Sequence, residues 1–581
     1  MALVLSFVTI YTRWQYYQRL RQFVDGPISG KQQLVESPQI PYTIPILGNT
    51  LAFLGPRPGQ YWNQLFTGHP RSTGICTLLL GGRKTHILFG DVNYVISTPP
   101  FQNKWRSGIY CEASPSAVQA LFKAKSPSRD VFDRDVFQKV FQLSNDQIHN
   151  LEAGRHHEVE MNSKYLTNFE RVNELTAGLT KVLDEVLAKD SQEIEKFEDI
   201  GLYQWLRDRL FTASTRALFG DELLKMYPAY CEDFYAFDSD LLSFFFSLPS
   251  FMMGDAFRRR RRIIGELESW SKKMHELSGG TPIDPEGPAW EPIFGSRLNR
   301  ARQLDYKTRN LTPRTGASLD LGLTFGLASN VIPATGWMLM HLLNPSADPS
   351  ILPRILKELH EAELPDGTLD IPVLVSQPLL QSLWTETLRL YLDALVTRNL
   401  TEDLLLPLDE DGKRVVRLRK GENVFAPSWL GHHDPVTWSS PGKVAANEFD
   451  AERFVVRDAK IGRESFSVGG TAGKYFPFGG GRTVCPGSKF VLGRLICMAP
   501  YRKRILAYWY RVTTGIFAKQ EALGALAMVL LRFDLEVLGF VDEKKKPTEA
   551  FPGLARAFVG SAVVVPGGDV RVKLRRKQMC R

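Results

Sequence analysis

The sequence lacks paired cysteines. Its six cysteines are scattered and none forms a C-x-x-C pair, which argues against a disulfide framework and against a zinc ribbon. We therefore expect a reducing compartment, in which a lone cysteine is usually a small buried apolar residue. The six are Cys76, Cys111, Cys231, Cys485, Cys497 and Cys580.

The sequence also has a small net charge for its length. Lys and Arg outnumber Asp and Glu by 72 to 63, a net charge of +9 over 581 residues, which is low for a nucleic-acid-binding protein. We expect no nucleic acid partner. A basic patch would suit anionic lipid headgroups or an acidic electron-delivery partner.

The apolar run at the start of the chain is short. It covers Ala2 to Tyr11 and stops at Thr12 and Arg13, whereas a membrane span needs roughly 20 apolar residues. We expect residues 1–25 to be a membrane-associated segment, half-inserted with its aromatic and basic flank at the headgroups. The alternative is a buried amphipathic start. We expect residues 26–50 to be a proline-rich hinge, within which Ser37 to Asn49, with Pro38, Pro41 and Pro45, cannot be helical.

A second apolar run, Leu241 to Met253, precedes five consecutive arginines, Arg258 to Arg262. Two interpretations remain open. The pair of segments is either a buried helix end followed by a solvated helix face, or a second surface that touches a membrane.

The chain is rich in apolar and aromatic residues. It is 44% hydrophobic, with 35 Phe, 18 Tyr and 11 Trp, a composition suited to a large core and to walls around an apolar ligand. Helical periodicity dominates the middle of the chain and strand-like segments are few, so we predict a mainly α fold with small β-sheets. The expected helices are Glu170–Lys189, Ile263–Leu277, Leu319–Leu343, Ile351–Glu361 and Leu379–Leu390, and the expected strands are Thr73–Leu80, His86–Phe89 and Val415–Leu418.

One cysteine stands in a setting suited to metal ligation. Cys485 follows a run of glycines in KYFPFGGGRTVCPG, and glycines let the backbone approach a flat ligand closely. Pro486 suits the first position of a helix, whose N-terminus would stabilise a thiolate. A soft thiolate on such a surface is typical of an iron ligand.

This loop resembles the haem-ligating loop of the cytochrome P450 family, F-x-x-G-x-x-x-C-x-G. Phe478, Gly481, Cys485 and Gly487 occupy its fixed positions. The basic residue that the family places two before the cysteine is Thr483 here, with Arg482 one position earlier. The resemblance implies haem b as cofactor, Cys485 as the axial iron ligand, and a haem-binding role for Phe478, Gly479, Gly481, Arg482 and Gly487.

Three further segments resemble motifs of the same family. Glu386 and Arg389 in TETLRL match its E-x-x-R, and Arg453 in NEFDAERF matches the third member of its structural Glu-Arg-Arg cluster. Residues 431–438, GHHDPVTW, match a third motif between them. Arg398 is a candidate partner for a haem propionate, or else an ordinary surface arginine. The resemblance implies a single-domain cytochrome P450 fold, with residues 51–581 as the haem-thiolate catalytic domain.

The expected oxygen-side helix departs from the family pattern. An acid and an alcohol are usual in it, and Ser329 and Asn330 stand there instead. The pattern of Asn330, Pro333, Ala334 and Thr335 resembles the branch with sterol 7α- and 12α-hydroxylases and prostacyclin synthase, and the chain resembles a fungal-type member. Asn330 can orient bound oxygen but cannot supply a titrating proton, so proton delivery would depend on water and Thr335. Alternatively, Asn330 only caps the bend at Pro333.

Residues 491–517 interrupt the helix that the family places after the cysteine. The segment contains Pro500 and Gly515 and shows no clean helical period, which would break that helix. We interpret it as an atypical insertion, a translated intron or another gene-model error, because residues 488–490 join smoothly to 518–521. The alternative is a real, looped-out insertion.

The resemblance implies a haem-thiolate monooxygenase that hydroxylates a lipophilic small molecule, such as a sterol, a terpenoid or another secondary metabolite. Electrons would come from an NADPH-dependent flavoprotein reductase, because the chain has no convincing flavin or nicotinamide motif. The expected location is the cytoplasmic face of the endoplasmic reticulum membrane. Two alternatives remain: a reductase-independent isomerase or dehydratase of a peroxide, and a catalytically inactive haem protein.

Overall fold

The computed structural model describes most of the chain. The described residues are 2–24, 32–45, 47–55, 58–70, 73–89, 115–190, 198–248, 251, 253–439, 444–458, 462–481, 516–555, 560 and 562–577. Cys485, Arg482, Gly487 and all but the last two residues of the predicted insertion lie outside them.

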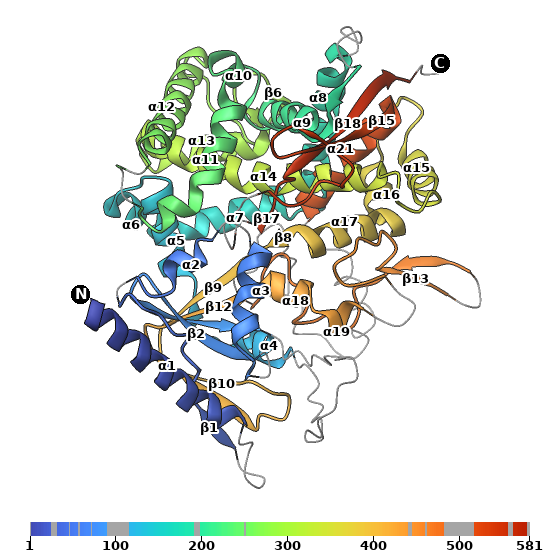
Figure 1. Cartoon of the computed structure of the whole chain (residues 1–581). Coiled ribbons are helices and arrows are strands. Elements are labelled where there is room, and N and C mark those ends of the chain that lie inside the picture. The colour runs from blue at the N-terminus through green and yellow to red at the C-terminus, as the bar shows by residue number, and fades with distance from the viewer. Residues whose placement is uncertain are drawn as a thin grey trace, which may run out of the picture.

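The described part is mainly helical with small sheets, as the sequence predicted (Figure 1). Its helices are α1 (Ala2–Val24), α2 (Thr50–Phe53), α3 (Pro58–Gly68), α4 (Ser116–Lys123), α5 (Asp130–Asp135), the π-helix η2 (Val136–Val140), α6 (Asn145–Ala153), α7 (Arg155–Leu166), α8 (Phe169–Asp190), α9 (Leu202–Phe219), α10 (Glu222–Met226), α11 (Tyr230–Phe245), α12 (Gly254–Leu277), α13 (Arg297–Thr308), α14 (Pro313–Leu342), α15 (Ile351–Ala362), α16 (Ile371–Ser376), α17 (Pro378–Tyr391), α18 (Ser428–His432), α19 (Pro435–Trp438) and α21 (Ile516–Arg532). The five segments with helical periodicity fall in α8, α12, α14, α15 and α17, so those predictions are confirmed.

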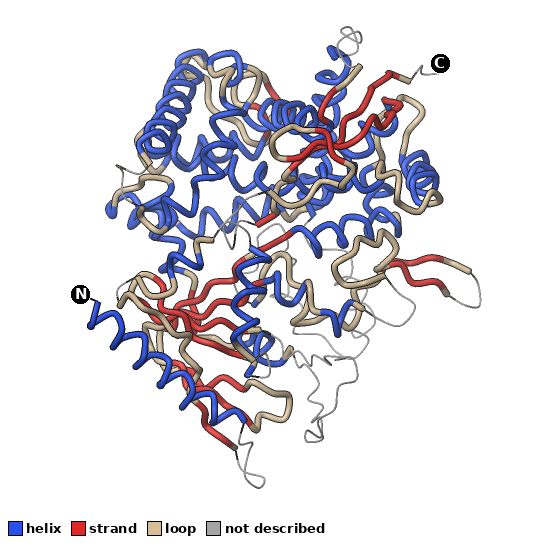
Figure 2. The backbone as a smooth tube through the Cα atoms, in the orientation of Figure 1, coloured by secondary structure: helices blue, strands red, loops and turns tan. Residues whose placement is uncertain are grey.

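The strands form separate sheets below and beside the helices (Figure 2). The largest has the order β2-β3-β12-β9-β4, and the others are β1-β11-β10, β16-β15-β18-β5, β13-β14, β17-β8 and β6-β7. The predicted strands fall in β2, β3 and β11. The bounds are β1 (Gln33–Val35), β2 (Ile75–Leu80), β3 (Arg83–Leu88), β4 (Pro127–Ser128), β5 (Ile200–Gly201), β6 (Trp290–Glu291), β7 (Gly295–Ser296), β8 (Leu392–Asp393), β9 (Leu395–Leu400), β10 (Leu404–Pro407), β11 (Arg414–Leu418), β12 (Asn423–Pro427), β13 (Val455–Arg457), β14 (Glu464–Phe466), β15 (Phe533–Asp542), β16 (Pro547–Thr548), β17 (Ala562–Val563) and β18 (Gly568–Arg576).

Helix α14 is central to the main core. It packs against α9, α12, α17 and α21, and its second half is buried almost throughout because its residues are apolar on every face. The Thr312 side chain caps its N-terminus by accepting a hydrogen bond from the Thr315 N–H at 3.2 Å. Pro333 lies inside the helix, as the sequence predicted.

Helix α1 extends past the apolar run, to Val24. It lies along the sheet side of the molecule (Figure 1), where Tyr16 is buried and its hydroxyl is hydrogen-bonded to His69 Nδ1 at 2.9 Å. Among the helices that the structure describes, none is both long and apolar enough to cross a membrane.

Candidate functional site

The described part of the predicted cysteine loop, up to Gly481, is shaped by its glycines. Gly479 and Gly481 have φ values of +74° and +71°, which side chains with a Cβ rarely adopt. A Cβ on Gly480 would lie 2.3 Å from the ring of Phe122. The loop therefore needs glycine in order to pack against α4. Phe478 is half-buried against the main core.

Arg398 on β9 is held against this loop. Its guanidinium is buried, Nη2 donates to the Gly480 carbonyl at 2.8 Å, and Nη1 donates to the Thr397 carbonyl at 2.8 Å. No carboxylate among the described residues lies within ion-pair distance of it, and burial lowers its pKa to about 10. A buried cation without an anion is unfavourable. Arg398 thus fits the propionate of a haem bound at the loop.

Glu386, Arg389 and Arg453 lie together. The carboxylate of Glu386 accepts from Arg389 Nε at 2.7 Å and Nη2 at 2.8 Å, and from Arg453 Nε at 3.0 Å. Glu386 and Arg389 are completely buried. The two arginines also donate to the backbone carbonyls of residues 432, 438, 444, 445, 446 and 448. The cluster therefore ties α17 to the chain that leads into the cysteine loop.

His432 connects this cluster to the loop. Its carbonyl accepts from Arg389 Nη1 at 2.9 Å, and its ring Nε2 accepts from the Phe476 N–H at 3.1 Å. Burial holds the pKa of His432 well below its ordinary value, so the ring is neutral and can accept this hydrogen bond. The sequence marked the motif around His432 but not this role, because the bond joins residues far apart in the chain.

Asn330 and Thr335 lie on α14 but have different partners. Asn330 Oδ1 accepts from the Val563 N–H at 3.1 Å and so holds β17. Thr335 is completely buried, and its hydroxyl donates to the Val331 carbonyl at 2.8 Å. No hydrogen bond joins either residue to the loop as far as the structure describes it. Gly326, one turn before Asn330, is exposed, and a Cβ at this position would meet open space.

Asp238 is a functional candidate that sequence reasoning missed. It lies on α11, where its carboxyl group interacts with the Ser329 hydroxyl of α14, and burial raises its pKa to about 7. Ser329 Oγ also donates to the Phe325 carbonyl at 2.6 Å. A hydrogen bond from Ser329 favours the ionised carboxylate, so it opposes the upward pKa shift that burial causes. An acid inside the aromatic run FYAFDSD was the available signal, but its partner on another helix was not predictable.

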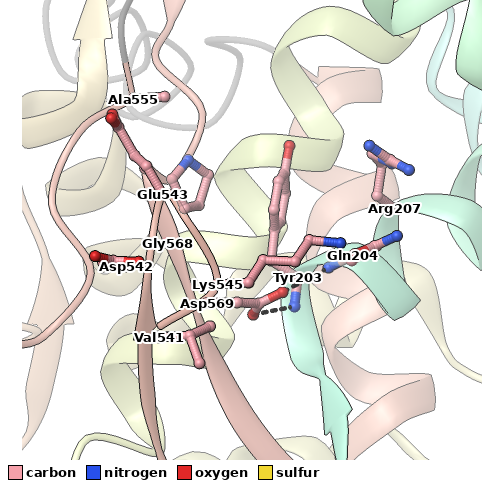
Figure 3. Close-up of a pocket in the computed structure, with 12 residues that line it drawn as sticks. Tyr203, Gln204, Arg207, Val541, Asp542, Glu543, Lys545, Ala555, Gly568 and Asp569 are labelled. Carbon is pink, nitrogen blue, oxygen red and sulfur yellow. Dashed lines mark hydrogen bonds between the residues drawn. The ribbon is translucent and has the colours of Figure 1, made fainter. Parts of the chain in front are cut away.

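A separate hollow of about 360 Å³ lies between the N-terminus of α9 and the β15 and β18 hairpin (Figure 3). There the carboxylate of Asp569 accepts from the backbone N–H groups of Tyr203 at 2.7 Å and Gln204 at 3.0 Å. Asp569 thus caps α9. This satisfies the buried acid, so we assign the hollow a structural role.

Comparisons with known proteins identify relatives. The family model described as cytochrome P450 matches residues 306–492, a range that holds α14, the Glu386 cluster and Cys485. The chain is 25% identical to the cytochrome P450 monooxygenase calL of Penicillium decumbens over 81% of this chain and 86% of that protein. It is 24% identical to the cytochrome P450 monooxygenase efuG of Hormonema carpetanum over 99% and 95%, and 24% identical to cytochrome P450 7A1 of Oryctolagus cuniculus over 70% and 72%.

Proposed function

Since the chain belongs to the cytochrome P450 family and is a haem-containing monooxygenase of fungal type, we propose that it hydroxylates a lipophilic small molecule. The substrate class is a sterol, a terpenoid or another secondary metabolite. Dioxygen is the oxidant, and an NADPH-dependent flavoprotein reductase supplies the electrons. The catalytic unit is one domain, residues 51–581.

The residues that hold the haem follow from the loop and its neighbours. Cys485, which lies outside the described residues, would bind the haem iron, and Phe478, Gly479, Gly481, Arg482 and Gly487 would contribute to the haem-binding loop. Arg398, buried and facing no carboxylate among the described residues, would pair with a propionate. When bound, the haem supplies the activation of dioxygen, which thiolate donation favours.

The position of Asp238 and its raised pKa are the observations that favour hydroxylation over a reaction of a peroxide. Reductive activation of dioxygen consumes protons, whereas rearrangement or dehydration of a peroxide does not. The acid that the family pattern would place at residues 329 and 330 of α14 is supplied instead by Asp238 of α11, beside Ser329, with a pKa raised to about 7. A group with a pKa near neutral pH can both hold and release a proton there.

The apolar walls support a lipophilic substrate. The ring of Phe141 lies 6.4 Å from that of Phe237 and 6.3 Å from that of Phe325, measured between centroids. Phe237 lies on α11 and Phe325 on α14, so the Phe141 ring contacts aromatic rings from both helices. Aromatic walls of this kind suit polycyclic apolar ligands.

The exposed side of α1 supports attachment to a membrane surface. Its apolar and aromatic side chains recur at helical spacing and are exposed to solvent: Leu3, Phe7, Ile10, Trp14 and Tyr17. The opposite side is fixed to the body through Tyr16. A helix with such a face lies in the headgroup region rather than across the bilayer. We place the enzyme at the cytoplasmic face of the endoplasmic reticulum membrane.

The experiment that tests the proposal compares two routes to product. The purified enzyme is supplied with candidate sterols or terpenoids, reductase and NADPH, and separately with lipid hydroperoxides without reductase. A product with one added oxygen atom that requires NADPH and reductase is the expected result. Conversion of a hydroperoxide without reductase would overturn the proposal in favour of an isomerase or dehydratase. Haem binding without substrate-dependent oxygen consumption would favour an inactive haem protein.

A further inference from the structure

The five-arginine run of α12 contains a buried guanidinium without an anionic partner in the described part of the chain. Arg260 is 3% exposed, and no described carboxylate lies within 4 Å of it. Its neighbours differ, since Arg261 is exposed and three others pair with aspartates: Arg258 with Asp255, Arg259 with Asp240, and Arg262 with Asp233. A buried cation without an anion is unfavourable unless something else satisfies it.

The contacts of Arg260 satisfy only part of its guanidinium. Nη1 donates to the carbonyl of Lys139 and to that of Val140, at 3.2 Å, at the end of η2. The guanidinium carbon lies 4.1 Å from the centroid of the Phe244 ring and 5.0 Å from that of Phe257. Nε is buried without a partner, and no described residue accepts from Nη2. Because Nε is covered, Nη2 is the nitrogen through which this guanidinium can donate to a bound oxyanion.

Arg260 lines a hollow of about 440 Å³. The walls come from η2 and the segment that follows it, from α6, from α12 and from the first turns of α14. Apart from Leu143, the lining is polar or basic: Gln138, Gln142, Ser144, Gln147, Arg260, Arg314, Thr315 and Ser318. The hollow is therefore built of hydrogen-bond donors and of two cations.

The charges around the hollow leave it positive. On α14, Arg314 lies 3.5 Å from Glu268 of α12, and that carboxylate also accepts from Lys272 at 2.8 Å. On η2, Lys139 pairs with Asp135 at 3.0 Å. Each of these carboxylates is therefore held by a lysine or arginine other than Arg260.

We propose that this hollow, around Arg260, is a binding site for a single oxyanion group, a carboxylate or a phosphate. The oxyanion would accept from Nη2 of Arg260 and from wall side chains such as Gln142 and Ser318. Thr315 and Asn330 are fifteen residues apart on one helix, so the site lies roughly 20 Å along the axis from the oxygen-side residues. The bound group is consequently not the one that is oxidised.

The test measures binding of inorganic phosphate to the full-length holoenzyme. Thermal unfolding is followed in phosphate and in chloride at equal ionic strength. The melting temperature should rise with phosphate and then level off, because a ligand that binds only the folded state stabilises it. In Arg260→Gln the phosphate affinity should fall about 10-fold or more. The exposed neighbour provides the control, and Arg261→Gln should bind as the wild type does.

A second variant covers the case in which Arg260→Gln does not fold. Gln142→Glu places a carboxylate of the chain itself in the hollow. It should raise the melting temperature in chloride and remove the dependence on phosphate. An unchanged phosphate response in Gln142→Glu or in folded Arg260→Gln, or the absence of a response in the wild type up to tens of millimolar, would overturn the proposal.

The source of the oxyanion is settled by competition. A long-chain fatty acid and the corresponding alcohol are compared as ligands. If the acid displaces phosphate and the alcohol does not, the site takes the acidic group of a lipophilic ligand. If phosphate binds and neither displaces it, the site takes a free anion. Both results depend on Arg260, so neither should appear in Arg260→Gln.

Discussion

Arg453 Nε lies 3.0 Å from Glu386 Oε1, so the Glu386 carboxylate on α17 holds two arginines from separate parts of the chain at once. Asp450 adds a backbone N–H to the same oxygen at 3.0 Å. The arginines in turn fix the carbonyls of the segment that leads to the cysteine loop. The geometry of that loop therefore depends on one buried carboxylate.

Replacing this carboxylate should destabilise the fold. Glu386→Gln leaves two buried guanidinium groups without their counter-charge, which costs about 3–5 kcal/mol. Urea unfolding followed by tryptophan fluorescence measures the change. The control is Glu536→Gln, because Glu536 forms an exposed pair with Arg575 at 3.8 Å and such pairs contribute at most about 1 kcal/mol. Equal effects of the two substitutions would contradict the role assigned to Glu386.

Asp238 should affect coupling between oxygen consumption and product formation. Asp238→Asn removes the titrating proton beside Ser329, so a larger share of the oxygen consumed should appear as hydrogen peroxide. Glu232→Gln, on an exposed part of the same helix, is the control and should leave the share unchanged. Equal peroxide yields in wild type and Asp238→Asn would show that protons arrive by another route.

The same residue predicts a pH dependence of stability. Burial raises the pKa of Asp238 from 3.8 to about 7, so the unfolded chain loses this proton at lower pH than the folded protein does. The stability that Asp238 contributes is thus complete below about pH 4 and is lost as the pH rises toward 7. Unfolding of the wild type and Asp238→Asn at pH values from 4 to 8 measures it. As the pH rises through this range, Asp238→Asn should become more stable relative to the wild type. Parallel curves of unfolding free energy against pH would contradict the raised pKa.

Arg398 should affect how tightly haem is held. Arg398→Gln removes the cation that we assign to a propionate, and a hydrogen bond to a charged group is worth about 1.5–3 kcal/mol. Haem transfer to apomyoglobin should therefore be about 10- to 100-fold faster. Arg398→Lys keeps the charge, so its haem transfer rate should lie between those of the wild type and Arg398→Gln. The exposed Arg417→Gln is the control. An unchanged transfer rate in Arg398→Gln would remove Arg398 from the haem site.

The sequence predicted local features better than contacts between distant segments. The periodic apolar residues of α14 and α17 were visible in the chain, as was the i, i+3 spacing of Glu386 and Arg389. Arg453 could be connected to them only through a family resemblance. Neither the pairing of β12 with β9 and β3 nor its register could be predicted, because register depends on tertiary packing.

The sequence also did not show which charged residues are buried. The five arginines of α12 are alike in sequence, yet only Arg260 is buried by the aromatic rings of Phe244 and Phe257. The acid at residue 238 could not be connected to Ser329 without the packing of α11 on α14. Both functional assignments depend on which face of a helix meets its neighbour, and periodicity alone does not say which neighbour that is.

The central claim is that Cys485 binds haem iron as a thiolate, and the carbon monoxide difference spectrum of the reduced protein tests it most directly. The spectrum is recorded for the full chain, for a form without residues 491–517, and for Cys485→Ala in the form that shows haem binding. We predict a strongly red-shifted Soret band in the form without the insertion, and its loss in Cys485→Ala. The same band in the full chain would show that the insertion is compatible with haem binding. Its absence from both forms, or its survival in Cys485→Ala, would contradict the assignment.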